Sequence, residues 1–62
     1  MDDTSADLPS LLARLKGAQH ALIEDAARQS GLPSTAVIRR IAEFENTIAA
    51  VLALIEEREG RP

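Results

Sequence analysis

The sequence predicts an all-α protein: an antiparallel two-helix hairpin that dimerises into a four-helix bundle. Apolar residues recur in steps of three and four over 8–27 and again over 37–55, the spacing of one helical face. A Gly-Leu-Pro sequence at 31–33 separates the two patterns, and so short a connection joins antiparallel neighbours. The chain has 62 residues and no cysteine, so a second subunit is the remaining way to stabilise so small a scaffold.

The first helix is expected over about residues 8–30. Asp7 is a favourable N-cap, and Pro9 fits the first turn, where its missing N–H costs nothing. Residues 1–6 are small and polar without periodicity, so we expect a disordered lead. The apolar face of this helix comprises Leu8, Leu11, Leu12, Leu15, Ala18, Leu22, Ile23, Ala26 and Ala27.

The predicted turn covers residues 31–34. Gly31 suits a left-handed backbone after a helix, an apolar residue follows it, and Pro33 cannot continue the helix. Either Ser34 or Thr35 can cap the next helix.

The second helix is expected over about 35–59, followed by a tail at 60–62. Its apolar residues alternate steps of four and three, as in a helix that lies along another helix; they are Val37, Ile41, Phe44, Ile48, Val51 and Ile55. Folding the chain at 31–33 predicts four facing pairs: Leu22 with Ile41, Leu15 with Ile48, Leu8 with Ile55, and Ala18 with Phe44.

Both apolar stripes are broader than one partner helix covers, and such a patch on a small monomer marks an interface. We therefore expect a homodimer, with a further protein partner packing on it. The segment 48–55 is apolar nearly all round, so it is central in the dimer or docks that partner. The predicted dimer and partner interface comprises Leu12, Ile23, Val37, Ile38, Ile41, Phe44, Ile48, Val51, Leu52 and Ile55.

Composition argues against several other classes. The net charge of −3 disfavours general electrostatic binding to nucleic acid or to an anionic membrane. The single aromatic residue disfavours binding through stacking on bases. The longest apolar run, 48–55, is far shorter than a membrane-spanning helix. The acidic start, Asp2 and Asp3, is unlike a signal peptide, so a cytoplasmic location is expected.

No catalytic or metal-binding pattern is present. His20, Glu24 and Asp25 offer a base and carboxylates on an exposed helix face, with no nucleophile beside them. His20 and Glu24 are four residues apart and could form half a metal site, which only a dimer could complete. We therefore expect no cofactor and no enzymatic activity.

The segment 24–41 resembles the DNA-binding helix-turn-helix motif in the spacing of Ala27, Gly31 and Val37. It departs from the motif at Arg40, where an aliphatic residue is usual. The resemblance implies a recognition helix from Ser34 onward. Its DNA contacts would come from Thr35, Arg39 and Arg40.

Two hypotheses follow. The first is a small non-enzymatic regulator or adaptor that acts through homodimerisation and helix packing on a protein partner. The alternative is a small DNA-binding transcriptional regulator, which the acidic composition does not favour.

Overall fold

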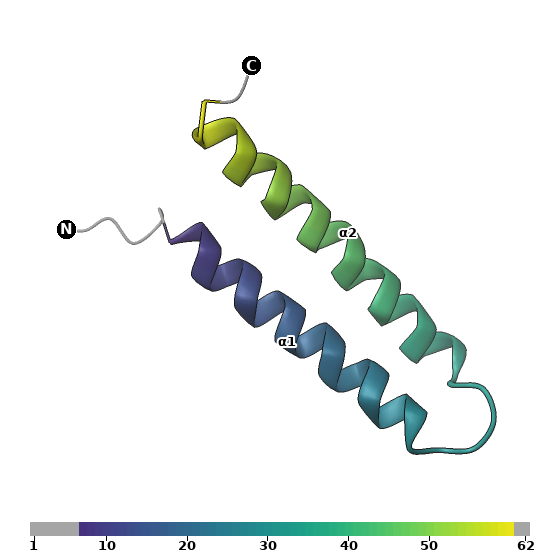
Figure 1. Cartoon of the computed structure of the whole chain (residues 1–62). Coiled ribbons are helices and arrows are strands. Elements are labelled where there is room, and N and C mark those ends of the chain that lie inside the picture. The colour runs from purple at the N-terminus through teal and green to yellow at the C-terminus, as the bar shows by residue number, and fades with distance from the viewer. Residues whose placement is uncertain (1–6, 61–62) are drawn as a thin grey trace.

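The computed structural model describes residues 7–60, which form two helices joined by one link. α1 spans Leu8–Ala27 and α2 spans Thr35–Arg58. The helices lie side by side and antiparallel along their length (Figure 1), and this part of the chain contains no strand. The predicted all-helical hairpin is therefore confirmed. The predicted disordered lead at 1–6 and the last two residues of the tail lie outside the described residues.

Each helix begins at a residue whose side chain accepts a hydrogen bond from the first turn. The Asp7 carboxylate accepts from the backbone N–H of Ser10 at 3.2 Å, and Pro9 occupies the start of the helix. The Ser34 hydroxyl accepts from the backbone N–H of Val37, also at 3.2 Å. These bonds satisfy amide groups that have no partner within the helix, so they fix where both helices start.

α1 ends at Ala27, three residues before the end that the sequence pattern predicts. The N–H of Gln29 bonds to the carbonyl of Ala26 at 3.2 Å, three residues back instead of four. A bond of this kind tightens the last turn and ends the helix. The link therefore comprises residues 28–34, and the shorter turn expected at 31–34 is wrong.

Gly31 has a φ of +80°, so the left-handed backbone expected there is confirmed. Leu32, the apolar residue that follows Gly31, projects from the link and is 91% exposed. At the far end, α2 finishes at Arg58, and Gly60 has a φ of +75°.

The two helices meet along one seam. Ile48, with 5% of its surface exposed, is the only buried hydrophobic residue within the described part of the chain. The other seam residues are half-buried; they are Leu8, Leu12, Leu15, Leu22 and Ala26 of α1, and Val37, Ile41, Phe44, Val51 and Ile55 of α2. Neither helix is long and apolar enough to cross a membrane. The seam alone is a small core for a folded chain.

Candidate interaction surface

Gln19 occupies a position in the seam of α1. The half-buried residues of α1 are spaced in steps of four and three, and the pattern requires one more member at residue 19. Gln19 is 8% exposed, whereas Ala18 is exposed. The prediction that Ala18 takes this place is therefore wrong. The continuous four-three spacing could have identified Gln19, but a search for apolar residues passes over a glutamine.

The side chain of Gln19 bonds to α2 twice. Its Nε2 donates to Oε1 of Glu45 at 2.9 Å and to the carbonyl oxygen of Ile41 at 3.3 Å. Ile41 and Glu45 are one turn apart, so the amide contacts two successive turns of the opposite helix. A buried polar group in an apolar seam fixes the register of two helices. The Gln19 hydrogen bonds therefore set which residues of α1 lie beside which residues of α2.

Three large aliphatic side chains of the helices remain exposed: Ile23 at 44%, Ile38 at 49% and Leu52 at 38%. Each directly follows a half-buried seam residue in the sequence. In an α-helix viewed from its N-terminus, each residue is rotated about 100° clockwise from the one before it. All three side chains therefore lie on the same flank of the seam. Because the helices are antiparallel, this flank is on the same side of the hairpin for both. The exposed aliphatic residues therefore share one face.

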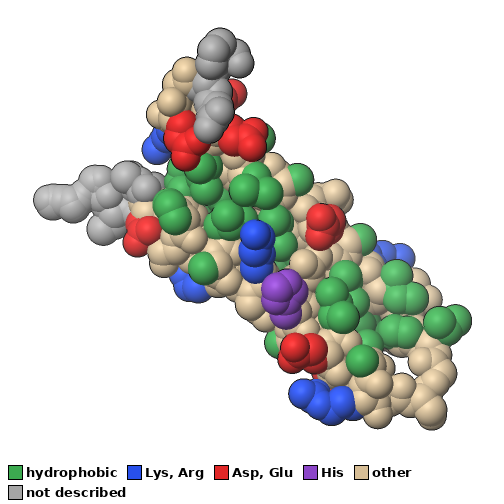
Figure 2. Space-filling view, viewed as in Figure 1, with side chains coloured by type: hydrophobic (Ala, Val, Ile, Leu, Met, Phe, Trp, Pro, Cys, Tyr) green, Lys and Arg blue, Asp and Glu red, His purple; other side chains and the backbone are tan. Residues whose placement is uncertain are grey.

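We call this side of the hairpin the apolar face. By the same helical count its exposed apolar members are Pro9, Ala13, Ile23, Ala27, Ile38, Ala42, Ala49 and Leu52, and His20 also lies on it. Its charged members are Lys16, Glu45 and Glu56. Figure 2 shows a face of this kind, with hydrophobic side chains along both helices and a few charges of both signs among them.

The opposite side of the hairpin is more polar. The same helical geometry places Arg14, Asp25, Arg40, Glu43 and Arg58 there, all of them exposed, with Arg28 and Glu57 at its outer edge. Asp25 and Arg28 form an exposed ion pair at 3.5 Å. The two sides therefore differ in chemistry: one resembles an interface and the other a solvated surface.

The structure divides the predicted interface residues into two sets. Three of them, Ile23, Ile38 and Leu52, lie on the apolar face. The other seven belong to the seam within one hairpin; they are Leu12, Val37, Ile41, Phe44, Ile48, Val51 and Ile55. An interface on the apolar face would therefore add to the seam and would not replace it.

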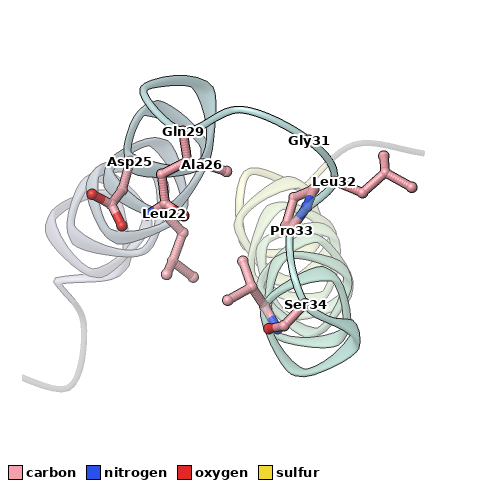
Figure 3. A pocket seen from close by; sticks show the side chains of 9 residues that line it. Leu22, Asp25, Ala26, Gln29, Gly31, Leu32, Pro33 and Ser34 are labelled. Carbon is pink, nitrogen blue, oxygen red and sulfur yellow. The ribbon is translucent and has the colours of Figure 1, made fainter.

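A shallow hollow lies where the link joins the two helices. Its volume is about 150 Å³, and Figure 3 shows Leu22 pointing into the gap while Leu32 turns away from it. Pockets that hold small molecules are commonly about 300–1,000 Å³. The hollow is too small for such a ligand.

The residues that the helix-turn-helix resemblance singles out are all exposed at the start of α2. They diverge in direction: Thr35 borders the apolar face, Arg40 lies on the opposite side, and Arg39 lies on the outer edge between them. In a helix-turn-helix the two helices meet at about 90–120°. α1 and α2 are antiparallel instead, so the structure does not form that motif.

His20, Glu24 and Asp25 are exposed on α1. Within residues 7–60, no group of three histidine or acidic side chains is placed to hold a metal ion. The Asp25 carboxylate lies near the Arg28 guanidinium instead of near His20.

Comparison of the chain with protein-family models, with curated proteins and with solved structures finds no significant match. The geometry of the hairpin is therefore the basis for a functional proposal.

Proposed function

We propose that this protein is a small non-enzymatic interaction protein, a regulator or adaptor that acts as a homodimer. The observation that carries the proposal is the alignment of Ile23, Ile38 and Leu52 on one face of the hairpin. A second copy presents the same face, and a two-fold axis makes such a face self-complementary. The product is a four-helix bundle.

The small core of one hairpin supports the proposal. Among the described residues, Ile48 alone is a buried hydrophobic side chain, so much of the apolar surface of both helices remains in contact with water. Transfer of apolar surface out of water contributes about 25 cal/mol per Å². Association therefore stabilises the fold itself, and folding and dimerisation are coupled.

The alanines of the apolar face also favour a second copy. Ala13 and Ala27 of α1, and Ala42 and Ala49 of α2, lie between the larger side chains. Small residues let helices approach to about 8–10 Å, so that large side chains of one copy fit beside small ones of the other.

The dimer would hold its protein partner through surface that dimerisation leaves free. Leu32 projects from the link, and the half-buried Leu11 and Leu54 lie on the side opposite the apolar face. A partner helix can pack on side chains of this kind. We place this activity in the cytoplasm, in keeping with a chain that has no cysteine.

The test is the molar mass of the protein in solution, measured by sedimentation equilibrium over a wide concentration range. We expect the mass of two chains and a thermal midpoint that rises with concentration. Leu52→Glu should weaken the dimer, while Ala50→Glu, at an exposed position of α2 that points away from the apolar face, should not. A single folded chain at every concentration would overturn the proposal.

The alternative, a DNA-binding regulator, has less support. Arg39 and Arg40 are exposed, but they point to different sides of α2, and the helices do not cross as a helix-turn-helix requires.

A further inference from the structure

We infer that the two hairpins of the dimer lie with their links at the same end, so that α1 of each copy packs on α2 of the other. This inference rests on the proposed homodimer. It comes from the charges on the apolar face, where Lys16 of one copy then meets Glu45 of the second copy.

Lys16 and Glu45 lie near the middle of the apolar face, one on each helix. Glu45 is held in place because one of its carboxylate oxygens accepts the Gln19 amide at 2.9 Å. Lys16 makes no ion pair with any residue in 7–60. The face therefore carries a positioned negative charge and an unpaired positive charge.

The Gln19 bonds also fix which residues of α1 and α2 are level, that is, at the same height along the hairpin. Gln19 is level with the turn between Ile41 and Glu45. Lys16 lies about one turn earlier in α1, and since α2 runs the other way it is level with residues near 45–49. By the same count, Ile23 is level with the turn that contains Ile38.

Two hairpins can stack face to face in two ways that keep a two-fold axis. When the axis is parallel to the helices, every residue keeps its level, α1 of one copy faces α2 of the other, and both links are at one end. When the axis is perpendicular to the helices, the links are at opposite ends, and each helix faces its own equivalent.

The aliphatic residues fit both arrangements. With the links together, Ile23 meets Ile38 of the second copy; with the links apart, Ile38 meets Leu52 of the second copy. Each arrangement therefore covers the exposed side chains, and the hydrophobic pattern does not select between them.

The charges select one arrangement. With the links together, Lys16 meets Glu45 of the second copy, and the symmetry makes this pair twice. With the links apart, the register that sets Ile38 against Leu52 also sets Glu45 against its own equivalent, and it brings Lys16 to the region of Lys16 of the second copy. Like charges in contact oppose association, whereas opposite charges support it and set its geometry.

A pair of spin labels tests the orientation directly. The chain has no cysteine, so Leu32→Cys provides one labelling site per copy on the most exposed side chain of the link. Pulsed electron paramagnetic resonance on the dimer should give a label separation of no more than about 30 Å, since adjacent helices are about 8–10 Å apart. A separation of about 36 Å or more, the length of α2, would overturn the inference.

Charge reversal gives a second measurement. Lys16→Glu should raise the dissociation constant of the dimer severalfold, and the combined variant Lys16→Glu/Glu45→Lys should recover affinity. Arg14→Glu changes the net charge equally but lies on the opposite side, so it should leave the dissociation constant unchanged. Equal effects of Lys16→Glu and Arg14→Glu would contradict the pairing.

The two proposals fail in different ways. A chain that remains monomeric in sedimentation overturns the homodimer and its orientation together. A dimer with a long label separation overturns the orientation alone and leaves the proposed function in place.

Discussion

The amide of Gln19 donates to the carboxylate of Glu45 at 2.9 Å, across the seam between two helices and 26 residues along the chain. Gln19 is buried in the seam, whereas Glu45 lies at its border, on the apolar face. One bond therefore connects the register of the hairpin with the surface that we propose for dimerisation. It also places the only acidic group near the centre of that face.

Replacing Gln19 with leucine should stabilise the protein. A polar side chain in an apolar seam specifies register at a cost in stability. The substitution leaves no buried group unsatisfied, because Glu45 is exposed and the Ile41 carbonyl lies within α2. We expect a gain of about 1 kcal/mol, or about 4–8 °C in the thermal midpoint at fixed concentration. Circular dichroism during heating measures it.

The matched control is Gln29→Leu, the same change at an exposed position in the link. It should leave the midpoint nearly unchanged. A lower midpoint for Gln19→Leu would mean that the bonds to α2 contribute more than burial of the amide costs.

The sequence was sufficient to predict the two helices and the Asp7 cap, and it limited the second cap to Ser34 or Thr35, because local chemistry decides these features. Asp7 and Ser34 each bond to the turn that follows, and Gly31 takes the backbone that only glycine adopts freely. The end of α1 was not predicted. It depends on a hydrogen bond from the backbone N–H of Gln29 to the carbonyl oxygen of Ala26, and neither glutamine nor alanine is a residue type that indicates a helix end.

The seam shows the limit of a hydrophobic pattern. The four-three spacing correctly predicted the apolar seam residues of α2, but a glutamine whose partners lie on another helix does not appear in a pattern of apolar residues. The sequence also predicted that Leu12, Ile23, Ile38 and Leu52 remain exposed beside the seam. This is wrong for Leu12, which is half-buried in the seam, whereas Ile23, Ile38 and Leu52 are exposed. That all three share one face required the antiparallel geometry to be known.

Placing a charge at Ile48 should abolish the fold. Ile48 is the most buried hydrophobic residue described, and Ile48→Asp would leave a carboxylate in the seam without a partner. We expect a loss of about 3 kcal/mol or more, enough to unfold so small a domain. Helical circular dichroism should disappear at room temperature.

The control for this charge is Asn46→Asp, two residues away on the exposed side of α2. It should retain the helical signal of the parent. If Ile48→Asp melts like the parent, then the seam is not the core of the protein.

Removing both arginines at the start of α2 tests the DNA-binding alternative. We expect the parent protein to show no retention of duplex DNA at low salt, because its net charge is −3 and its helices do not form the motif. The variant Arg39→Ala/Arg40→Ala should then behave as the parent does in a gel-shift measurement. Retention by the parent that disappears in the variant would favour the alternative over the interaction protein.

Two glycines should respond to substitution in opposite ways. Gly31 has a φ of +80° and open space around the position of a Cβ, so Gly31→Val meets no neighbour and is opposed by the backbone alone. A left-handed backbone costs an L-residue about 1–2 kcal/mol.

Gly17 lies inside α1, also with open space around it, and Gly17→Ala should stabilise the protein by about 0.5–1 kcal/mol. Urea unfolding of both variants at one concentration measures the two changes. If Gly31→Val is neutral, the link adopts another conformation in solution; if Gly17→Ala is destabilising, α1 is not continuous through residue 17.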